Sequence, residues 1–342
     1  MLSSASIDRA APAGAALAQP SAPMTEVPPP YVGRFAPSPT GPLHFGSLVA
    51  AVGSLLDARS RGGRWLLRIE DVDAPRTVSG AAEGIVDTLE RFGFEWDGDI
   101  VRQSDRLDAY RDAFERLEAA GHIFPCACTR REIADSALAR DGSRIYPGTC
   151  RNGLPRGRSA HAWRVRAEGR IVFDDRVQGH QEEDLAAEVG DFVVLRGDGQ
   201  FAYQLAVVVD DAAAGVTDVV RGADLLGSTG RQVHLQRLLG SPTPTYAHLP
   251  VVVNAAGEKL SKQTLATPVE ALVPARAWLA ALAFLGQNPP KTLCGAALPE
   301  IRRWAIAHWS PANIPRQVPA AAAAAFVAPS ASGRNATTGT RT

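Results

Sequence analysis

The chain has 342 residues, of which 45% are apolar and 21% charged, so it has the length and composition of a globular protein with one large domain or two smaller ones. Its 36 basic residues balance 36 acidic ones, which excludes binding to nucleic acid or membranes through overall charge and leaves anionic ligands to a local patch. A membrane span is excluded as well, because no run reaches about 18 strongly apolar residues.

The two ends and the cysteines indicate where the protein works. Residues 1–30 are interrupted by charges and prolines, which predicts a disordered leader rather than a signal peptide, and residues 311–342 predict a disordered tail. Three of the four cysteines fall within 25 residues, which does not fit a disulfide framework. We therefore expect a cytoplasmic protein, taken as a monomer, in which the distant Cys294 is a small buried hydrophobe.

The first part of the chain alternates strands and helices. The expected elements are a strand at Tyr31–Phe35, a helix at Leu43–Ser60, a strand at Trp65–Ile69, and helices at Ser79–Phe92 and Leu107–Ala120. This order predicts an α/β fold with a Rossmann-like, doubly wound parallel sheet, whose first half spans residues 31–121.

Residues 122–185 are rich in Arg and Gly, contain the clustered cysteines and show no long helical pattern, so they predict an insertion. The second half of the sheet domain is expected over residues 186–267, and a short helical, stem-like part over residues 268–310. Apolar runs at which the α/β pattern resumes are Phe192–Leu195, Phe201–Val209 and Val216–Val220. They are followed by a helix near Gly230–Leu239, a strand at Leu249–Val253, and helices at Pro268–Leu285 and Glu300–Trp309.

The loop after the first strand has the features of an anion site. A helix that starts near His44 directs its free N–H groups at whatever lies above the sheet edge. Gly46 leaves room for a flat ring or a phosphate, and the imidazole of His44 is a suitable donor to a phosphate oxygen. Taken alone, the loop fits equally a proline-rich connector with a surface histidine.

Lysine is rare in this chain, since only Lys259, Lys262 and Lys291 occur among the 36 basic residues. The first two lie three positions apart after an expected tight turn, and their ammonium groups suit a pyrophosphate leaving group. A solvated turn is the simpler interpretation of a lysine pair, but this chain otherwise fills its surface with arginine.

The clustered cysteines, Cys126, Cys128 and Cys150, predict a structural zinc ion, because a small loop-rich insertion folds poorly without a metal. The alternative is three inert buried thiols. Spacing leaves the fourth ligand open among His122, Asp135, Asp141, Tyr146 and His161. The insertion also carries a local concentration of basic residues suited to a phosphate backbone or to a solvated face, namely Arg144, Arg151, Arg156, Arg158, Arg164 and Arg166.

Together, the His44 loop and the lysine pair resemble the two motifs of class I aminoacyl-tRNA synthetases. The flanking segments Arg34–Gly41, Leu67–Asp73, Val209–Asp211 and Val220–Asp224 resemble the glutamyl branch, and the resemblance covers about residues 31–290. The sequence departs from the motifs at Ser47, where the second histidine is expected, and at Leu260 and Gln263 in the lysine loop.

The resemblance implies a role for each matching position. Residues expected to bind glutamate are Arg34, Phe35, Ala36, Pro37, Ser38, Glu70, Tyr203 and Arg221. Residues expected to bind ATP, which enters with Mg²⁺, are Gly41, His44, Gly46, Ser47 and Lys262. His44, Lys259 and Lys262 are the expected catalytic residues.

The Cys-x-Cys and Tyr-x-x-x-Cys arrangement is similar to the zinc site of glutamyl-queuosine tRNA(Asp) synthetases, which makes Tyr146 the fourth ligand. Only about 50 residues separate Lys262 from the expected tail, which leaves no room for an anticodon-binding region. The resemblance thus implies ATP-dependent activation of L-glutamate and its transfer to the queuosine base of tRNA(Asp). The alternatives are a truncated glutamyl-tRNA synthetase that charges tRNA(Glu), another nucleotidyltransferase that acts on a small acid, and a non-enzymatic, zinc-containing RNA-binding relative.

Overall fold

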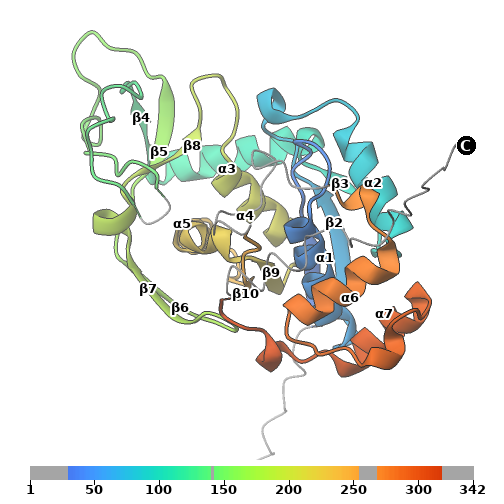
Figure 1. Cartoon of the computed structure of the whole chain (residues 1–342). Coiled ribbons are helices and arrows are strands. Elements are labelled where there is room, and N and C mark those ends of the chain that lie inside the picture. Colours follow the sequence, from blue (N-terminus) through green and yellow to red (C-terminus); the bar gives the residue numbers. More distant parts are fainter. Residues whose placement is uncertain (1–29, 140–141, 254–267, 318–342) are drawn as a thin grey trace, which may run out of the picture.

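The computed structural model describes residues 30–139, 142–253 and 268–317 (Figure 1). Nearly all of the expected leader, most of the expected tail, and both Lys259 and Lys262 therefore lie outside the described residues. The division of the chain into domains stays a prediction.

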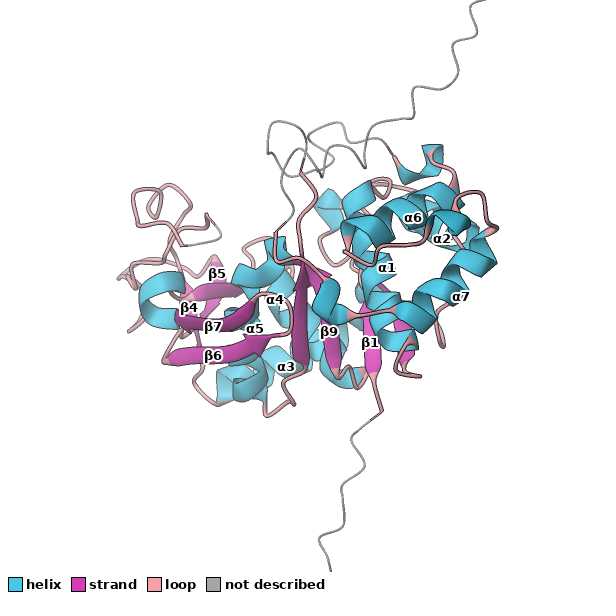
Figure 2. Cartoon of the chain, turned by 60° about the horizontal axis from the view of Figure 1, so that its bottom comes forward, coloured by secondary structure: helices cyan, strands magenta, loops and turns pink. Residues whose placement is uncertain are grey.

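A parallel sheet forms the centre of the fold (Figure 2). Its strands in chain order are β1 (Val32–Phe35), β2 (Arg64–Ile69), β3 (Val101–Arg102), β9 (Asp218–Gly222) and β10 (Thr245–Leu249). The pairing runs β3-β2-β1 on one side and β9-β10 on the other. The two sides meet where the backbone N–H of Thr217 donates to the carbonyl of Val32 at 2.9 Å. The strand order therefore reverses between β1 and β9, the point at which doubly wound sheets bind their ligands.

Helices cover both faces of this sheet. Neighbouring strand residues point to opposite faces, so Val220 and Leu249 belong to one apolar core, and Val219 and Tyr246 to the other. The first core is closed by α1 (Phe45–Arg59), α2 (Ala81–Arg91), α6 (Pro274–Phe284) and α7 (Leu298–His308). The second is closed by α3 (Leu107–Ala119), α4 (Tyr203–Ala213) and α5 (Leu226–Leu239). This arrangement confirms the doubly wound α/β fold.

The chain between α3 and α4 builds two further β units, to the left in Figure 1. The first is an antiparallel sheet of β4 (Ile123–Cys126), β5 (Ala162–Val165) and β8 (Phe192–Leu195). The second is the hairpin of β6 (Arg170–Asp175) and β7 (Gly179–Asp184). The hairpin extends the central sheet, because Asp175 pairs in parallel with Tyr246 of β10.

Two of the apolar runs at which the α/β pattern is expected to resume do not supply strands to the parallel sheet. The run Phe192–Leu195 is a strand, but it pairs antiparallel with β5 and so belongs to the small sheet rather than to the parallel one. The run at 201–209 lies mostly in helix α4. A short apolar run that is buried on several sides has no period that separates strand from helix.

Other expected elements are shifted, and one burial expectation is wrong. The strand expected at Leu249–Val253 ends at Leu249, because Pro250 has no N–H with which to continue the ladder. The helix expected from Pro268 begins at Pro274, and a short turn precedes it. Proline is favoured at the first position of a helix, since that N–H has no partner within the helix. Cys294 is exposed rather than buried.

Asp57 of α1 is a buried carboxylate, 2% exposed, that connects three parts of the chain. Its Oδ2 accepts hydrogen bonds from the Tyr31 hydroxyl and from Arg176 Nη2, both at 2.7 Å, and its Oδ1 accepts one from Trp309 Nε1 at 3.2 Å. Burial acts to raise the pKa of Asp57, but the contacts with Arg176 and Tyr31 hold this pKa below its ordinary value.

None of the helices in the described part of the chain combines the length and apolarity that crossing a membrane requires.

Candidate functional site

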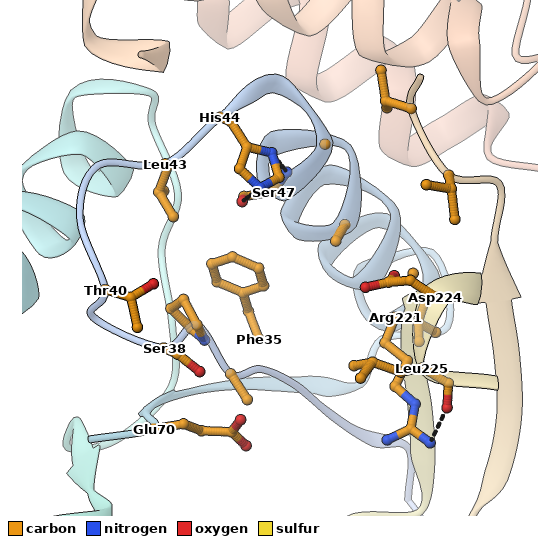
Figure 3. A pocket seen from close by; sticks show the side chains of 18 of the residues that line it. Phe35, Ser38, Thr40, Leu43, His44, Ser47, Glu70, Arg221, Asp224 and Leu225 are labelled. Carbon is orange, nitrogen blue, oxygen red and sulfur yellow. Dashed lines mark hydrogen bonds between the residues drawn. The ribbon is translucent and has the colours of Figure 1, made fainter. Parts of the chain in front are cut away.

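A cavity of about 290 Å³ opens at the carboxyl ends of β1 and β9. All eight residues expected to bind glutamate line it, and so do His44, Gly46 and Ser47 from the start of α1. Gly41 instead lines a separate hollow beside the start of α2. Figure 3 shows Glu70 and Arg221 on opposite sides of the opening and His44 at its rim, so one pocket joins the two groups of expected binding residues.

His44 caps helix α1. It precedes the helix in an extended conformation, and its Nδ1 accepts the backbone N–H of Ser47 at 3.2 Å (Figure 3). A side chain that accepts from the third helical residue satisfies one of the free N–H groups of the first turn. Because Nδ1 is an acceptor here, the neutral imidazole carries its proton on Nε2, which lies 3.3 Å from the Ser47 hydroxyl.

The sequence predicts that Gly46 leaves space for a ligand, but the structure gives a more specific reason for a glycine at this position. A Cβ at Gly46 would lie 3.1 Å from both Cε1 and Nδ1 of His44. The absent side chain therefore makes room for the capping imidazole itself.

Below the pocket lies a buried network of charges. Arg34 Nε lies 3.2 Å from Asp211 Oδ1, and Arg68 Nη1 lies 2.7 Å from the same oxygen. Arg68 Nη2 also reaches Glu70 Oε1 at 3.3 Å. All four side chains are at most 9% exposed. The charges of the two guanidinium groups and the two carboxylates thus offset one another. Of the two residues that line the pocket, Glu70 is paired with Arg68 and Arg34 is paired with Asp211.

The two carboxyl groups of this network differ in acidity. Burial acts on both, but Arg34 and Arg68 hold the pKa of Asp211 below its ordinary value. For Glu70, burial prevails over the same two guanidinium groups, and its pKa is raised. A positively charged ligand group that binds beside Glu70 would favour the ionised form of the Glu70 carboxyl group.

Arg221 and Tyr203 complete the walls. Arg221 is 5% exposed and extends from β9, whereas Tyr203 is the first residue of α4. Burial, together with the charge of Glu70, raises the pKa of Tyr203. The hydroxyl therefore keeps its proton at neutral pH and remains a donor to an acidic ligand.

The lysine pair falls in residues 254–267, outside the described residues, but both flanks of that segment can be placed. Val252 lines the pocket. Pro268 forms a β-bridge with His44, and the backbone N–H of Val269 donates to the carbonyl of Leu43 at 2.9 Å. The chain therefore leaves the described structure and returns to it at the rim of the same pocket.

The three clustered cysteines come together at the end of β4. Cys126, Cys128 and Cys150 present sulfur atoms that all lie within 4.8 Å of one another. The hydroxyl of Tyr146 lies 3.4 Å from the sulfurs of both Cys126 and Cys128 and accepts the backbone N–H of Cys150 at 2.8 Å. The structure thus brings the fourth expected ligand to the thiols, and the triad is a candidate metal site.

The spacing of these atoms fits a tetrahedral ion. With zinc–sulfur bonds of about 2.3 Å and a zinc–oxygen bond of about 2.0 Å, two sulfurs lie about 3.8 Å apart and a sulfur and an oxygen about 3.5 Å apart. Cys128 Sγ and Cys150 Sγ are 3.7 Å apart, and the two distances from Tyr146 to sulfur are 3.4 Å. These three distances fit a tetrahedral site of three thiolates and one oxygen, a donor set that zinc accepts.

Sequence reasoning misplaced one arginine of the insertion. Arg164 is 8% exposed and cannot belong to a surface patch for phosphates. Its Nε donates to Cys126 Sγ at 3.4 Å, and its guanidinium carbon lies 4.0 Å from the centre of the Tyr146 ring. Two others, Arg151 and Arg158, form ion pairs with Glu168 and Glu132. Arg156 is exposed.

Sequence reasoning also missed Arg68 and Asp211 as members of the site, and His248 and Asp175 behind Arg221. Arg68, Asp211 and His248 are charged or polar residues inside mostly apolar runs, whereas Asp175 stands at the end of a strand between Asp174 and Arg176. The contrast with the apolar run is the signal that marks the first three, because a buried charge is kept only with a partner.

Comparison with known proteins decides the family. Residues 31–278 match the family model described as tRNA synthetases class I (E and Q), catalytic domain. A protein from Aromatoleum aromaticum named glutamyl-Q tRNA(Asp) synthetase is 79% identical over 300 residues, which cover 88% of this chain and 95% of that protein. One of the same name from Dechloromonas aromatica is 59% identical over 291 residues, which cover 84% of this chain and 97% of that protein. This chain belongs to the glutamyl-Q tRNA(Asp) synthetases.

Solved structures agree on the fold of this class I synthetase-like ligase. The glutamate-tRNA synthetase of Elizabethkingia anophelis matches with a TM-score of 0.70 at 24% identity, and the match covers 87% of this chain and 70% of that one. At this identity the likeness speaks for the fold alone.

Proposed function

We propose that this chain activates L-glutamate with ATP and transfers the glutamyl group to the queuosine base of tRNA(Asp). The observation that carries this proposal is the single pocket in which Glu70 and Arg221 face each other beneath the capped start of α1. The names of the relatives support the same substrates.

The amino-acid end of the pocket suits a dicarboxylic amino acid. The carboxylate of Glu70 faces the substrate ammonium group, and Arg34, Arg221 and the hydroxyl of Tyr203 face its carboxylates. Hydrogen bonds from a guanidinium to a carboxylate are strengthened by charge, which favours an acidic substrate over its amide. Phe35, Ala36, Pro37 and Ser38 form the floor and one wall beside it.

The nucleotide end is the start of α1. Free N–H groups and the positive end of the helix dipole favour the phosphates of ATP, which enters with Mg²⁺. His44 presents Nε2–H to the reacting phosphate, while Gly46 and Ser47 border the nucleotide. Gly41 lines the neighbouring hollow, so we assign it no contact with the nucleotide. We assign Lys262 to the transition state and Lys259 to the leaving pyrophosphate, and the position of both flanks of their segment at the pocket rim supports this.

Two steps follow. A carboxylate oxygen of glutamate attacks the α-phosphorus of ATP in line, the bond to the bridging oxygen breaks, and pyrophosphate leaves. A queuosine hydroxyl then attacks the carbonyl carbon of the mixed anhydride, loses its proton, and AMP leaves. The protein contributes positioning and charge stabilisation, which are the main sources of rate in phosphoryl and nucleotidyl transfer.

We propose Zn²⁺ as the metal of the Cys126, Cys128, Cys150 and Tyr146 site, where it would tie the insertion together structurally. All four positions would be filled by protein atoms, which is the arrangement of a structural rather than a catalytic site. We keep a cytoplasmic location as a prediction. We keep the monomer as a prediction that light scattering would test.

The test uses glutamate-dependent exchange of pyrophosphate into ATP, followed by charging assays. Exchange without tRNA supports the activation step, and its absence would favour a non-enzymatic RNA-binding relative. Exchange with a different small acid but not with glutamate would favour another nucleotidyltransferase. Glutamate should then appear on tRNA(Asp) that contains queuosine. Its appearance on tRNA(Glu), or on tRNA(Asp) without queuosine, would contradict the proposal.

A further inference from the structure

The guanidinium of Arg221 is held by four uncharged acceptors. Its Nε donates to His248 Nε2 at 3.0 Å, and its Nη1 donates to Gln232 Oε1 at 2.8 Å. Its Nη2 donates to Thr229 Oγ1 at 2.8 Å. The same nitrogen donates to the carbonyl of Leu225 at 3.4 Å (Figure 3). These contacts use four of the five N–H groups of the guanidinium, so the cradle fixes its plane and leaves one N–H on Nη1 for a ligand.

This environment differs from that of the other arginines near the pocket. Arg34 and Arg68 each lie against the carboxylate of Asp211, and Arg68 also lies against Glu70. Within the described residues, no such ion pair forms at Arg221. Among the described arginines of this pocket wall, Arg221 is therefore one that no carboxylate contacts at ion-pair distance, which leaves it available to an anionic substrate.

His248 is the acceptor that requires the most preparation, because an imidazole nitrogen accepts only in one tautomer. His248 Nδ1 lies 2.6 Å from Asp175 Oδ2, so its proton points at the carboxylate and leaves Nε2 with a lone pair for Arg221. Both side chains are fully buried. Burial, with the charge of Arg221 as a further cause, lowers the pKa of His248 to about 4, which keeps the imidazole neutral.

Asp175 is in turn held rigidly. Its Oδ1 accepts the backbone N–H groups of Val177 at 2.9 Å, Gln178 at 2.7 Å and His248 at 3.1 Å. It stands at the end of β6, where this strand pairs with β10. The chain of contacts therefore runs from the hairpin through β10 to the pocket.

We propose that Asp175 and His248 are positioning residues that orient Arg221 toward one carboxylate of the amino-acid substrate. The inference rests on the proposed function, because it takes glutamate as the ligand of this pocket. Neither residue touches the substrate. Asp175 selects the tautomer of His248, His248 fixes the plane of the guanidinium, and Arg221 makes the contact.

Two substitutions at His248 separate its two hydrogen bonds. His248→Gln places an amide oxygen near the position of Nε2, so it retains an acceptor for Arg221. His248→Asn places its amide near Nδ1, so it retains the contact with Asp175 and loses the acceptor. Asp175→Asn presents an amide N–H to Nδ1, which forces the proton onto Nε2 and sets two donors against each other.

The readout is pyrophosphate exchange with glutamate and ATP varied in turn. We expect His248→Asn and Asp175→Asn to raise the KM for glutamate about tenfold, equivalent to about 1.4 kcal/mol. The KM for ATP should stay within twofold, and His248→Gln should recover most of the loss. His234→Asn is the matched control, because His234 is also largely buried but contacts the carbonyl of Arg166 away from the pocket.

The variants should also lose discrimination against one analogue, either L-glutamine or isoglutamine, measured as inhibitors of exchange. Equal rises in both KM values, or equal losses for His248→Gln and His248→Asn, would show a merely structural role and overturn the inference. An unchanged glutamate KM in all variants would overturn it as well. Failure of the wild-type protein to catalyse exchange with glutamate would instead contradict the proposed function.

Discussion

Arg34 Nε and Asp211 Oδ1 lie 3.2 Å apart, and this buried contact ties β1, at the start of the described chain, to helix α4. Arg68 of β2 approaches the same carboxylate. One side chain therefore connects the two halves of the sheet domain directly below the pocket.

Asp211→Asn should lower the free energy of unfolding by about 3–5 kcal/mol, because it leaves two buried guanidinium groups with too little negative charge. Urea unfolding measures this change. Asp198→Asn is the control, since Asp198 pairs with Arg196 at the surface, and it should change stability by less than about 0.5 kcal/mol. Similar small effects of both substitutions would refute the importance of the buried network.

Stability should fall in acid. The pKa values of Asp57, Asp175 and Asp211 are lower in the folded protein than their ordinary value of about 3.9. Groups of this kind stabilise the fold fully above the unfolded pKa and lose that contribution as the pH falls through the folded one. Glu70 acts in the opposite direction, because burial raises its pKa, but it is one group against three.

The buried His248 adds to this loss, because its pKa is about 4 in the folded protein whereas an unfolded histidine takes up a proton near pH 6.5. We therefore expect the urea midpoint to begin to fall below about pH 6.5 and to fall steeply below about pH 4. A midpoint that rises on acidification would contradict this expectation. Asp211→Asn should flatten the acid limb, because it removes one of the three groups.

The cap and the proposed catalytic role of His44 can be separated. His44→Ala should cost about 1 kcal/mol of stability, since it removes the acceptor for the N–H of Ser47. Asparagine is a good helix cap but has no imidazole N–H for a phosphate. His44→Asn should therefore keep the melting temperature and still lower kcat for exchange. If activity falls only in the variant that also loses stability, His44 acts only as a helix cap.

The rarity of lysine offers a clean test of the lysine loop. Lys262→Ala should lower kcat for exchange by about 10²–10³, the loss typical for one group that stabilises developing charge. Lys259→Ala should have its main effect on the release or binding of pyrophosphate. Lys291→Ala lies outside the pocket lining and serves as the control. Comparable rates for Lys262→Ala and the control would exclude a role in the transition state.

Metal analysis tests the thiol site. The purified protein should contain one zinc ion per chain, and Cys128→Ser should lose it. Protein that retains full zinc after this substitution, or that contains none before it, would remove the proposal.

Arg164 provides a finer test of the same site. Three thiolates and a tyrosine oxygen around Zn²⁺ form an anionic group, and the guanidinium that contacts Cys126 and Tyr146 offsets that charge. Arg164→Met should therefore release zinc faster to a chelator. Arg156→Met, at an exposed position of the same insertion, should release it at the wild-type rate.

Much of the site was predictable from the sequence because it depends on local order. A strand, a turn and a helix in succession place Arg34–Ser47 at the carboxyl edge of a parallel sheet whatever the rest of the chain does. The same applies to Glu70 after the second strand. The three cysteines were within reach because their spacing along the chain is short, whereas spacing left the fourth ligand open and only the family resemblance implied Tyr146.

The sequence could not show which charges neutralise one another. Whether Asp211 already offsets the charge of Arg34 when the substrate binds depends on a contact between residues 177 positions apart. The partners of Arg221 are likewise distributed over α5 and β10, and Asp175 comes from the hairpin. The strand partner of Phe192–Leu195 and the burial of Arg164 depend on tertiary packing in the same way.

Asp57 has a consequence for how this protein can be dissected. Its two oxygens receive donors from the segment before β1, from the β6–β7 turn and from the residue after α7, so the carboxylate is satisfied only when all three are docked. Expressing the catalytic half without the hairpin, or removing the last helix, would leave a buried negative charge short of partners. Modules that look separable along the chain are therefore expected to fold or unfold together, and truncation is a poor route to a minimal enzyme.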